Sequence, residues 1–458
     1  MNNTATYQQN DRREIFGWLM YDWANSVFFT TVLGVLIGEY ITALAQKAVG
    51  ENGVVFSFAG HDLVTAKSLF SYSVGLSVFL QVFFLPVMGA IADYTHLKKT
   101  FMAFFCYLGV IGCCLLFFIG AQTYVLGCVF FIVANLSAGA SIVFYNSYLP
   151  DITSEDKRDR VSSWGFALGY ISGGLVLLAN LVLLKNAESY GISTDLAVRI
   201  CLLTSGLWWG GFSIITFSLL KTRQPARSVP EGKHYLTAGL GELWGTFREL
   251  FRLKHTLLFL IAYLFYNDGV QTVISSSSVF LSQELFVAKG IETDKSVLVI
   301  AFLIAQIVGI LGAIAFERIA RFTSAKAAIL ISLVVWSAIV IYAYAFLETL
   351  TQAYILSGAI GFVLGGSQAL SRSLFSQMIP AGRESSFFGI YEISERGTSW
   401  LGPIVFGLVA QLTDSYRPAI LALIVFFGVG AIVLFFVNTA RAIHEAGNLT
   451  PAEAGEHQ

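Results

Sequence analysis

Repeated apolar runs of about 20 residues constrain the fold of this chain more than any other feature of its sequence. A helix of that length crosses the roughly 30 Å hydrocarbon core of a bilayer. Of the 458 residues, 56% are hydrophobic and only 12% are charged, whereas charged residues make up about a quarter of an ordinary soluble domain. Each run therefore predicts a transmembrane helix, and the chain is predicted to be an all-α membrane protein.

The runs predict twelve transmembrane helices. The N-terminus is polar and the first run continues to Leu44 without a small-residue cleavage site, so we expect no signal peptide. Short loops make consecutive helices antiparallel neighbours. The predicted spans cover residues 15–44, 67–93, 100–120, 122–149, 161–184, 196–220, 255–287, 295–317, 325–347, 350–378, 387–412 and 417–438.

Lysine and arginine gather on one side of these predicted spans. With the N-terminus inside, nineteen of the 28 basic residues fall on the inner side and seven on the outer side. Positive charges favour the cytoplasmic side of a membrane protein. The count therefore predicts a protein of the cell (inner) membrane with both termini in the cytoplasm.

The chain also contains an internal repeat. "GAIA" ends the second predicted span at residues 89–92 and the eighth at 312–315, and Pro150 is matched by Pro380. Duplicated six-helix halves are typical of transporters that bind their substrate between the repeats. The predicted division is into an N-terminal six-helix bundle, a basic cytoplasmic linker whose amphipathic second half lies on the membrane surface, a C-terminal six-helix bundle and a cytoplasmic tail. Their residues are 1–220, 221–254, 255–440 and 441–458.

Polar residues inside the spans recur on every third helix, while helices 3, 6, 9 and 12 are almost uniformly apolar. This period predicts a ring of helices 1, 4, 7 and 10 around a wet cavity, with the apolar helices toward lipid. The alternative is that these side chains only form hydrogen bonds between helices. The predicted pathway residues, two from each polar helix in order, are Asp22, Asn25, Asn135, Asn146, Asp268, Gln271, Gln368 and Arg372.

Helix 5 carries a different pattern. Gly165, Gly169 and Gly173 repeat at every fourth residue and form a smooth face for close helix packing. We interpret this face as structural, on a helix that lines the interface of the two halves.

Helix 11 places Glu392, Glu395 and Arg396 within an apolar span, although a charge at the bilayer centre costs about 2.5–3.5 kcal/mol on insertion scales. Glu392 and Arg396 have the spacing of an intrahelical ion pair. Arg372 lies at a matching depth on helix 10, so it is a candidate partner of Glu395. Two interpretations stay open at this point, namely structural salt bridges between helices 10 and 11, and a gating network whose ion pairs break in one conformation.

The loop after helix 2, "GAIADYTHLKK", resembles the glycine–aspartate–basic signature of the major facilitator superfamily. Gly89, Asp93, Lys98 and Lys99 match that signature, while Tyr94 stands where the superfamily usually has a basic residue. The resemblance places Asp93 against the start of helix 11. The predicted gating network therefore combines this loop with helix 11 and consists of Gly89, Asp93, Lys98, Lys99, Glu392, Glu395 and Arg396.

Two further segments, "GWLMYDWANSVFFTTV" at residues 17–32 and "AYLFYNDGVQTVI" at 262–274, resemble the bacterial relatives of the yeast vacuolar amino-acid effluxers of autophagy. The similarity covers essentially all spans. It implies a secondary transporter of amino acids or similar small metabolites that works by alternating access.

Asp268 is the predicted coupling carboxylate, because a buried carboxyl without a neighbouring cation favours the protonated form. Its alternative role is to accept hydrogen bonds from Asn25 or Tyr21. The expected partners are a small-molecule substrate, the lipid bilayer and a proton or other coupling ion, and we expect a monomer. No enzyme activity, cofactor, metal or nucleic acid is expected. The alternative functions are a non-transporting membrane sensor and an exporter of a different amphipathic compound.

Overall fold

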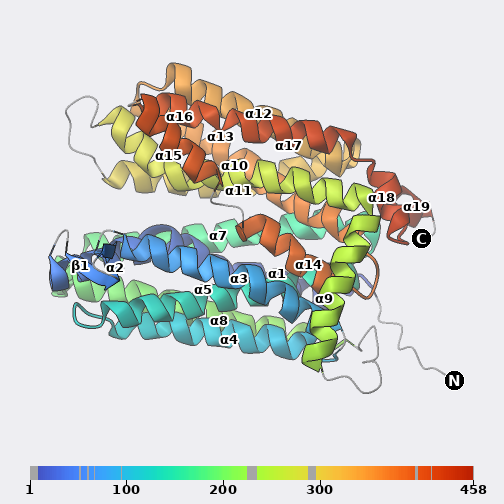
Figure 1. Cartoon of the computed structure of the whole chain (residues 1–458), viewed down its shortest axis with the longest axis horizontal. Helices are drawn as coiled ribbons and strands as arrows, with labels where there is room; N and C mark the ends of the chain where they lie inside the picture. The colour runs from blue at the N-terminus through green and yellow to red at the C-terminus, as the bar shows by residue number, and fades with distance from the viewer. Residues whose placement is uncertain are drawn as a thin grey trace.

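The computed structural model describes residues 9–50, 53–58, 61–66, 68–93, 95–223, 235–286, 295–397, 401–413 and 415–456. Its long helices run side by side in two groups, one from each half of the chain (Figure 1). The first helix begins and the last helix ends at the same end of the bundle (Figure 1). We call this end the terminal face and the opposite end the distal face.

The first half begins with a helical run of 38 residues, Arg12–Val49. Nine residues near its middle form a π-helix, a form that is rare elsewhere and frequent at functional sites. A two-stranded antiparallel hairpin, which the sequence did not predict, follows at the distal face. The elements are α1 (Arg12–Val27), η1 (Phe28–Leu36), α2 (Ile37–Val49), β1 (Val54–Phe58), β2 (His61–Thr65), α3 (Leu69–Asp93), α4 (Lys98–Leu115), η2 (Leu116–Phe118), α5 (Tyr124–Ser147), α6 (Leu149–Ile152), η3 (Glu155–Lys157), α7 (Arg158–Lys185), η4 (Glu188–Tyr190) and α8 (Thr194–Leu219).

The second half follows an amphipathic helix, α9, which the sequence predicted within the linker. The elements are α9 (Tyr235–Arg252), α10 (Lys254–Leu285), α11 (Lys295–Phe322), α12 (Ala325–Phe346), α13 (Leu350–Gln377), α14 (Glu384–Glu392), η6 (Ile393–Gly397), α15 (Leu401–Thr413), α16 (Tyr416–Ala422), α17 (Ile424–Phe436), α18 (Thr439–Glu445) and α19 (Pro451–Glu456).

The predicted all-α class with twelve membrane helices is confirmed. Within the described ranges, eleven helices are long and apolar enough to cross a membrane, and α15 is a shorter apolar helix. The predicted eleventh span, residues 387–412, corresponds to α14, the π-helical η6 and α15, which begin at Glu384 and end at Thr413. Residues 398–400 of this span lie outside the described part of the chain.

Large apolar side chains cover the outside of the bundle. Phe104 on α4, Ile214 on α8, Val334 on α12 and Ile432 on α17 are exposed, as expected of the helices predicted to face lipid. An apolar surface of this extent is stable only when lipid covers it, since water disfavours large apolar patches.

The two halves repeat each other in their contacts as well as in their sequence. The Tyr21 hydroxyl donates to Ser141 Oγ at 2.7 Å, which joins helix 1 to helix 4. In the second half, the hydroxyl oxygens of Tyr266 and Ser371 lie 2.6 Å apart and join helix 7 to helix 10. The two serines are separated by 230 residues, the same offset as Pro150 and Pro380.

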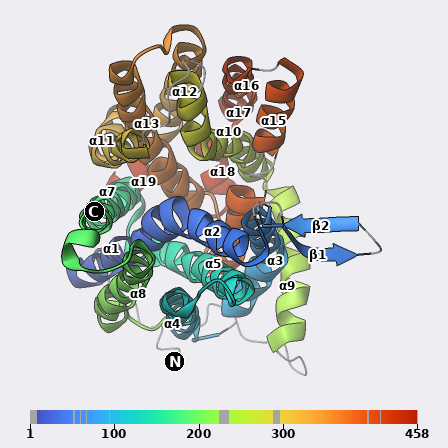
Figure 2. The same cartoon turned by 90° about the vertical axis from the view of Figure 1, so that its left-hand side faces the viewer.

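The halves meet in two regions. α7 of the first half packs against α11 and α13 of the second, and α3 and α5 pack against α14. Figure 2, seen from the distal face, shows α7 beside α11, with α3 on the other side of the first half. Helix 11 therefore begins against the first half of the chain and continues into the second.

The glycine face of α7 allows close packing against helix 1, and α7 lines the interface of the two halves, as predicted. A Cβ atom on Gly165 would collide with the Asp22 carboxylate, and one on Gly173 would lie 2.8 Å from the Thr30 side chain. Because glycine has no side chain, α7 approaches the polar stripe of helix 1 closely and leaves room for charged groups there.

Candidate substrate and ion pathway

Arg372 is the centre of the polar site between the two halves. Only 4% of its surface is exposed, and it lies on α13, close to the terminal face. Its Nη2 and Nη1 atoms lie 3.3 Å and 3.4 Å from Asp22 Oδ2 on α1. This ion pair connects the two halves of the chain in the interior of the bundle.

The remaining donors of the guanidinium are directed at the first half as well. Nε donates to Ser162 Oγ and Nη2 to the Ser162 carbonyl oxygen, both at 2.9 Å. Nη1 lies 3.5 Å from Asn146 Oδ1. Arginine presents five N–H donors in a fixed fork, and here that fork reaches α1, α5 and α7 at once.

Aromatic rings enclose the guanidinium. Its central carbon lies 4.9 Å from the Trp18 ring, 5.6 Å from the Tyr145 ring and 4.3 Å from the Phe166 ring. Trp18 stacks on Tyr145 with ring centroids 4.3 Å apart, and the Trp18 indole donates to the Tyr145 carbonyl oxygen at 2.8 Å. Desolvated cation–π contacts each stabilise a cation by about 2 kcal/mol.

Asp22 receives a third hydrogen bond on the oxygen that faces Arg372. The Tyr145 hydroxyl donates to Asp22 Oδ2 at 2.7 Å. Gly165 of α7 lies against the same oxygen, where any larger residue would displace it. Tyr145, Asp22 and Arg372 therefore form one buried unit that draws on both halves.

The structure corrects the predicted pairing of Arg372 with Glu395. Both Asp22 and Glu395 are carboxylates at a suitable depth, and helix packing selects Asp22. Glu395 instead uses its backbone oxygen to accept from Asn267 Nδ2 at 3.0 Å. Asn146 bridges the site to helix 11, because its Nδ2 donates to Glu392 Oε1 at 3.0 Å. The predicted pair of Glu392 with Arg396 lies outside the described part of the chain, since the side chain of Arg396 is not described.

A second polar contact joins the halves at the terminal face. Asp93, at the end of α3, accepts from the backbone N–H groups of Ser385 at 3.0 Å and Ser386 at 2.9 Å. These residues form the first turn of α14, where free N–H groups and the helix dipole favour an anion. Gly89 is required there, because a Cβ on it would collide with the Ser385 carbonyl oxygen. The predicted contact of Asp93 with the start of helix 11 is therefore present.

The two lysines of the signature loop have different partners. Lys98 Nζ donates to the Ser147 carbonyl oxygen and to Asp151 Oδ2, both at 2.9 Å, so it lies beside the Asp93 contact. Lys99 Nζ instead donates to the Leu220 carbonyl oxygen at 2.6 Å and caps the end of α8. Lys326 caps the end of α17 in the same way. Lys99 therefore stabilises a helix end and does not join the contacts of Asp93. Tyr94 of the same loop lies outside the described residues.

The start of α7 adds residues that the sequence analysis missed. Ser373 Oγ donates to Asp159 Oδ1 at 2.6 Å, Arg158 donates to the Ser376 carbonyl oxygen at 3.3 Å, and Ser162 is bonded to Arg372. The internal repeat of the sequence contains a signal that could have identified the start of α7 as part of the site. "RVSSWGF" at residues 160–166 and "RESSFFG" at 383–389 are 223 residues apart, the offset of the two "GAIA" copies.

Asp268 lies at a separate place within the second half. Its Oδ2 accepts from the backbone N–H of Gly402 on α15 at 2.9 Å. Its Oδ1 is buried and has no hydrogen-bond partner among the described residues. The alternative in which Asp268 accepts from Asn25 or Tyr21 is wrong, because Tyr21 donates to Ser141 and the described partner of Asp268 is on α15.

The remaining predicted pathway residues divide into two kinds. Asn135 Nδ2 donates to Ser77 Oγ at 2.9 Å, which is a contact between helices 4 and 2 within one half. Asn25 is buried, Gln271 and Gln368 are half-buried, and within the described ranges none of their side chains has a hydrogen-bond partner. Asn25, Gln271 and Gln368 are therefore polar groups that a bound molecule could contact.

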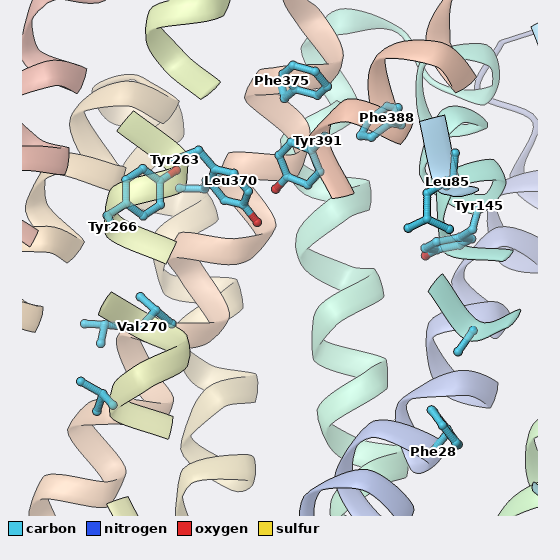
Figure 3. Close-up of a cluster of buried hydrophobic side chains, with 14 of the residues drawn as sticks. Phe28, Leu85, Tyr145, Tyr263, Tyr266, Val270, Leu370, Phe375, Phe388 and Tyr391 are labelled. Carbon is cyan, nitrogen blue, oxygen red and sulfur yellow. The ribbon is translucent and has the colours of Figure 1, made fainter. Parts of the chain in front are cut away.

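An aromatic group supports the second-half side of the site. Tyr391 of α14 stacks on Tyr263 of α10 with centroids 4.5 Å apart and on Phe375 of α13 at 5.0 Å. Figure 3 shows these rings on the second-half helices, with Tyr145 on the side of the first half. The stacking fixes α14 relative to α10 and α13, and thereby fixes the helix that carries Glu392.

Solved structures with a similar fold are transporters of the major facilitator superfamily. The human organic anion transporter MFSD10 superimposes with a TM-score of 0.69 at 13% identity and covers 93% of this chain and 100% of that one. The Escherichia coli fucose:proton symporter FucP gives a TM-score of 0.66 at 12% identity, with coverages of 93% and 98%. The chain therefore has the fold of these multi-pass membrane proteins.

The sequence narrows the class to one family. Residues 10–447 match the family described as "Vacuole effluxer Atg22 like", and the chain belongs to it. A Bacillus subtilis protein, the uncharacterized MFS-type transporter YxiO, is 30% identical over 95% of this chain and 97% of its own length. Autophagy-related protein 22 of Kluyveromyces lactis is 26% identical over 98% of both chains.

Neutralising Arg372 should destabilise the protein strongly, and neutralising Asp22 as well should recover part of that loss. Arg372→Gln leaves the Asp22 carboxylate buried with only neutral donors, and breaking a buried ion pair from one side costs about 3–5 kcal/mol. Thermal unfolding of the purified protein in detergent measures the effect. The double change Arg372→Gln with Glu395→Gln is the matched control and should give no recovery. Recovery in the control but not in the Asp22 double variant would contradict the observed pairing.

Asp93→Asn should shift the protein toward a conformation that is open at the terminal face. The amide keeps one acceptor oxygen but loses the charge, and hydrogen bonds to a charged group contribute about 1.5–3 kcal/mol each. We expect cysteines placed along α5 and α13 near that face to react with a water-soluble maleimide at least about tenfold faster. Lys99→Gln is the control and should leave the labelling rates unchanged. Equal rates in Asp93→Asn and the native protein would exclude a gating role for Asp93.

Proposed function

We propose that the protein is a secondary active transporter that moves a small zwitterionic metabolite, of the amino-acid type, across the cell membrane by alternating access and in exchange with protons. The observation that carries this proposal is the buried ion pair of Asp22 and Arg372, whose two members belong to opposite halves of the chain. The family description as an effluxer and the twelve-helix fold support the transport class.

The ion pair ties substrate binding to conformational change. If the halves part at the terminal face, Asp22 and Arg372 separate and each becomes an uncompensated charge in a low-dielectric interior. A zwitterion removes this penalty. Its carboxylate can bind Arg372 in place of Asp22, and its ammonium group can bind Asp22 and Tyr145 in place of Arg372. Protonation of Asp22 is the other route to neutrality. A substrate with only one of the two charges would leave one member of the pair unbalanced.

The direction of closure supports the alternating-access part of the proposal. Polar contacts between the halves, among them those of Asp93, Asp159, Arg158 and Arg372, lie toward the terminal face. The excess of lysine and arginine assigns that face to the cytoplasm. In this conformation the transporter is closed to the cytoplasm, and the conformation that opens there must break the Asp93 contact and the Arg372 pair together.

Asp268 is the second carboxylate in this proposal and serves proton coupling. Its Oδ1, which has no hydrogen-bond partner among the described residues, is an acceptor that a proton would convert into a donor, and an unsatisfied buried acceptor costs about 1–3 kcal/mol. Asp268 lies on α10 at the contact with the start of α15. Protonation of Asp268 can therefore change the packing of α15 against α10 without changing the charges of the substrate site at Arg372.

Purified protein in liposomes should accumulate a labelled neutral amino acid when a pH gradient is imposed, and an excess of unlabelled zwitterions should compete. Arg372→Lys keeps the charge but loses the forked geometry, so we expect at least about tenfold weaker apparent affinity from the loss of one charge-assisted hydrogen bond. The zwitterion model would be contradicted if the corresponding amine without the carboxylate, or the acid without the amino group, competed as strongly as the amino acid itself. Binding without any uptake would indicate a sensor.

Asp268→Asn should abolish accumulation driven by the pH gradient while substrate exchange across the liposome membrane continues. The amide carries no titratable proton, so the coupling step is lost and the binding groups remain. Glu188→Gln, which neutralises an exposed carboxylate of η4, is the control and should leave the accumulation unchanged. If Asp268→Asn still accumulates substrate against a gradient with unchanged pH dependence, the coupling role of Asp268 is excluded.

A further inference from the structure

The helix α9 lies across the ends of the spans rather than beside them. In Figure 1 it runs nearly perpendicular to the long helices at the terminal face, and in Figure 2 it occupies the outer edge of the molecule beyond α3. It packs against α3, α14 and α10. A helix in this place is level with the polar headgroups of the surrounding bilayer, because the apolar spans end there.

The inner face of α9 is fixed by specific contacts. Thr246 and Leu250 are buried. Arg383, the residue that precedes α14, donates from Nη2 to Thr246 Oγ1 at 2.7 Å and forms an ion pair with Glu249. Glu249 is thus paired on the inner side of α9, next to the helix whose first turn binds Asp93.

The outer face of α9 has a different composition. Trp244 and Phe251 are 68% and 67% exposed, and the exposed side chains of Arg248 and Arg252 lie between and beside them. The spacing of four and seven residues places Trp244, Arg248 and Phe251 on one side of a helix. Exposed tryptophan and phenylalanine next to arginine are typical of helices that lie in the membrane interface, where the rings enter the acyl boundary and the cations meet phosphate.

We propose that this outer face of α9 is a binding site for anionic phospholipid headgroups of the leaflet at the terminal face. Charge complementarity favours an anionic lipid over a zwitterionic one, since both exposed cations are arginines that bind phosphate through two N–H groups at once. The position of α9 at the ends of the spans favours lipid over a soluble protein partner. The site also connects the headgroup layer to Arg383 and hence to the start of α14.

The test is binding of a fluorescent phosphatidylglycerol to the purified full-length protein in detergent, measured by anisotropy, with phosphatidylcholine carrying the same label as the reference lipid. Each interfacial arginine contributes about 1 kcal/mol of attraction to an anionic surface, which is about fivefold in affinity. We therefore expect Arg248→Gln with Arg252→Gln to weaken phosphatidylglycerol binding by about 30-fold and to leave the weaker phosphatidylcholine binding unchanged.

Two control variants make the result specific. Arg12→Gln with Arg318→Gln removes two exposed arginines at the terminal face away from α9 and should leave the affinity unchanged. Glu249→Gln breaks the inner ion pair with Arg383 and should lower the melting temperature without changing the lipid affinity. Equal losses in the α9 variant and the arginine control, or equal binding of the two lipids by the native protein, would overturn the proposal. Because no substrate is added, the result is independent of whether the zwitterion model holds.

Discussion

A charged group in the interior of a membrane protein requires a partner, and this requirement organises the site around Arg372. The guanidinium is buried among helices of the opposite half, where Asp22, Ser162 and Asn146 accept its hydrogen bonds. Other features follow from the need to accommodate this group. Gly165 leaves the space that the Asp22 carboxylate fills, and Trp18 and Phe166 supply ring faces in place of water.

The repeat of the two halves shows which features belong to the scaffold. The paired Tyr–Ser hydrogen bonds and the lysines that cap α8 and α17 occur once in each half. The central charges are not repeated. The offset of 230 residues that relates Ser141 to Ser371 matches Arg372 with Ile142. The match of Tyr21 with Tyr266 likewise pairs Asp22 with Asn267. Both members of the ion pair thus have uncharged counterparts in the other half, and this is the departure from symmetry expected of a functional site.

The terminal face is held by several separate polar contacts. Asp93 accepts hydrogen bonds from the first turn of α14, Lys98 donates to the last turn of α5, and Ser162 Oγ at the start of α7 donates to the Ala369 carbonyl oxygen. Hydrogen bonds of neutral pairs contribute about 1 kcal/mol each, and those to charged groups about 1.5–3 kcal/mol. The buried pair of Arg372 and Asp22 cannot separate without a replacement charge, so it controls when the others are released.

The sequence by itself determined the class of fold, because apolar runs of a fixed length leave a chain in lipid with few alternatives to helices. It also located the contact of Asp93 with helix 11 through the signature loop, and it placed Asp22 and Arg372 on helices that line one region. It did not determine their pairing. Asp22 and Arg372 are 350 residues apart, and Glu395 is another carboxylate at a similar depth. The tertiary structure decided the pairing. The packing of α1 on the glycine face of α7 brings Asp22 to the interface, where it meets Arg372, while Glu395 lies beside α10. The same reason explains why Ser162 and Tyr145 were missed, since a serine or a tyrosine gains its role only from the neighbours that the tertiary structure provides.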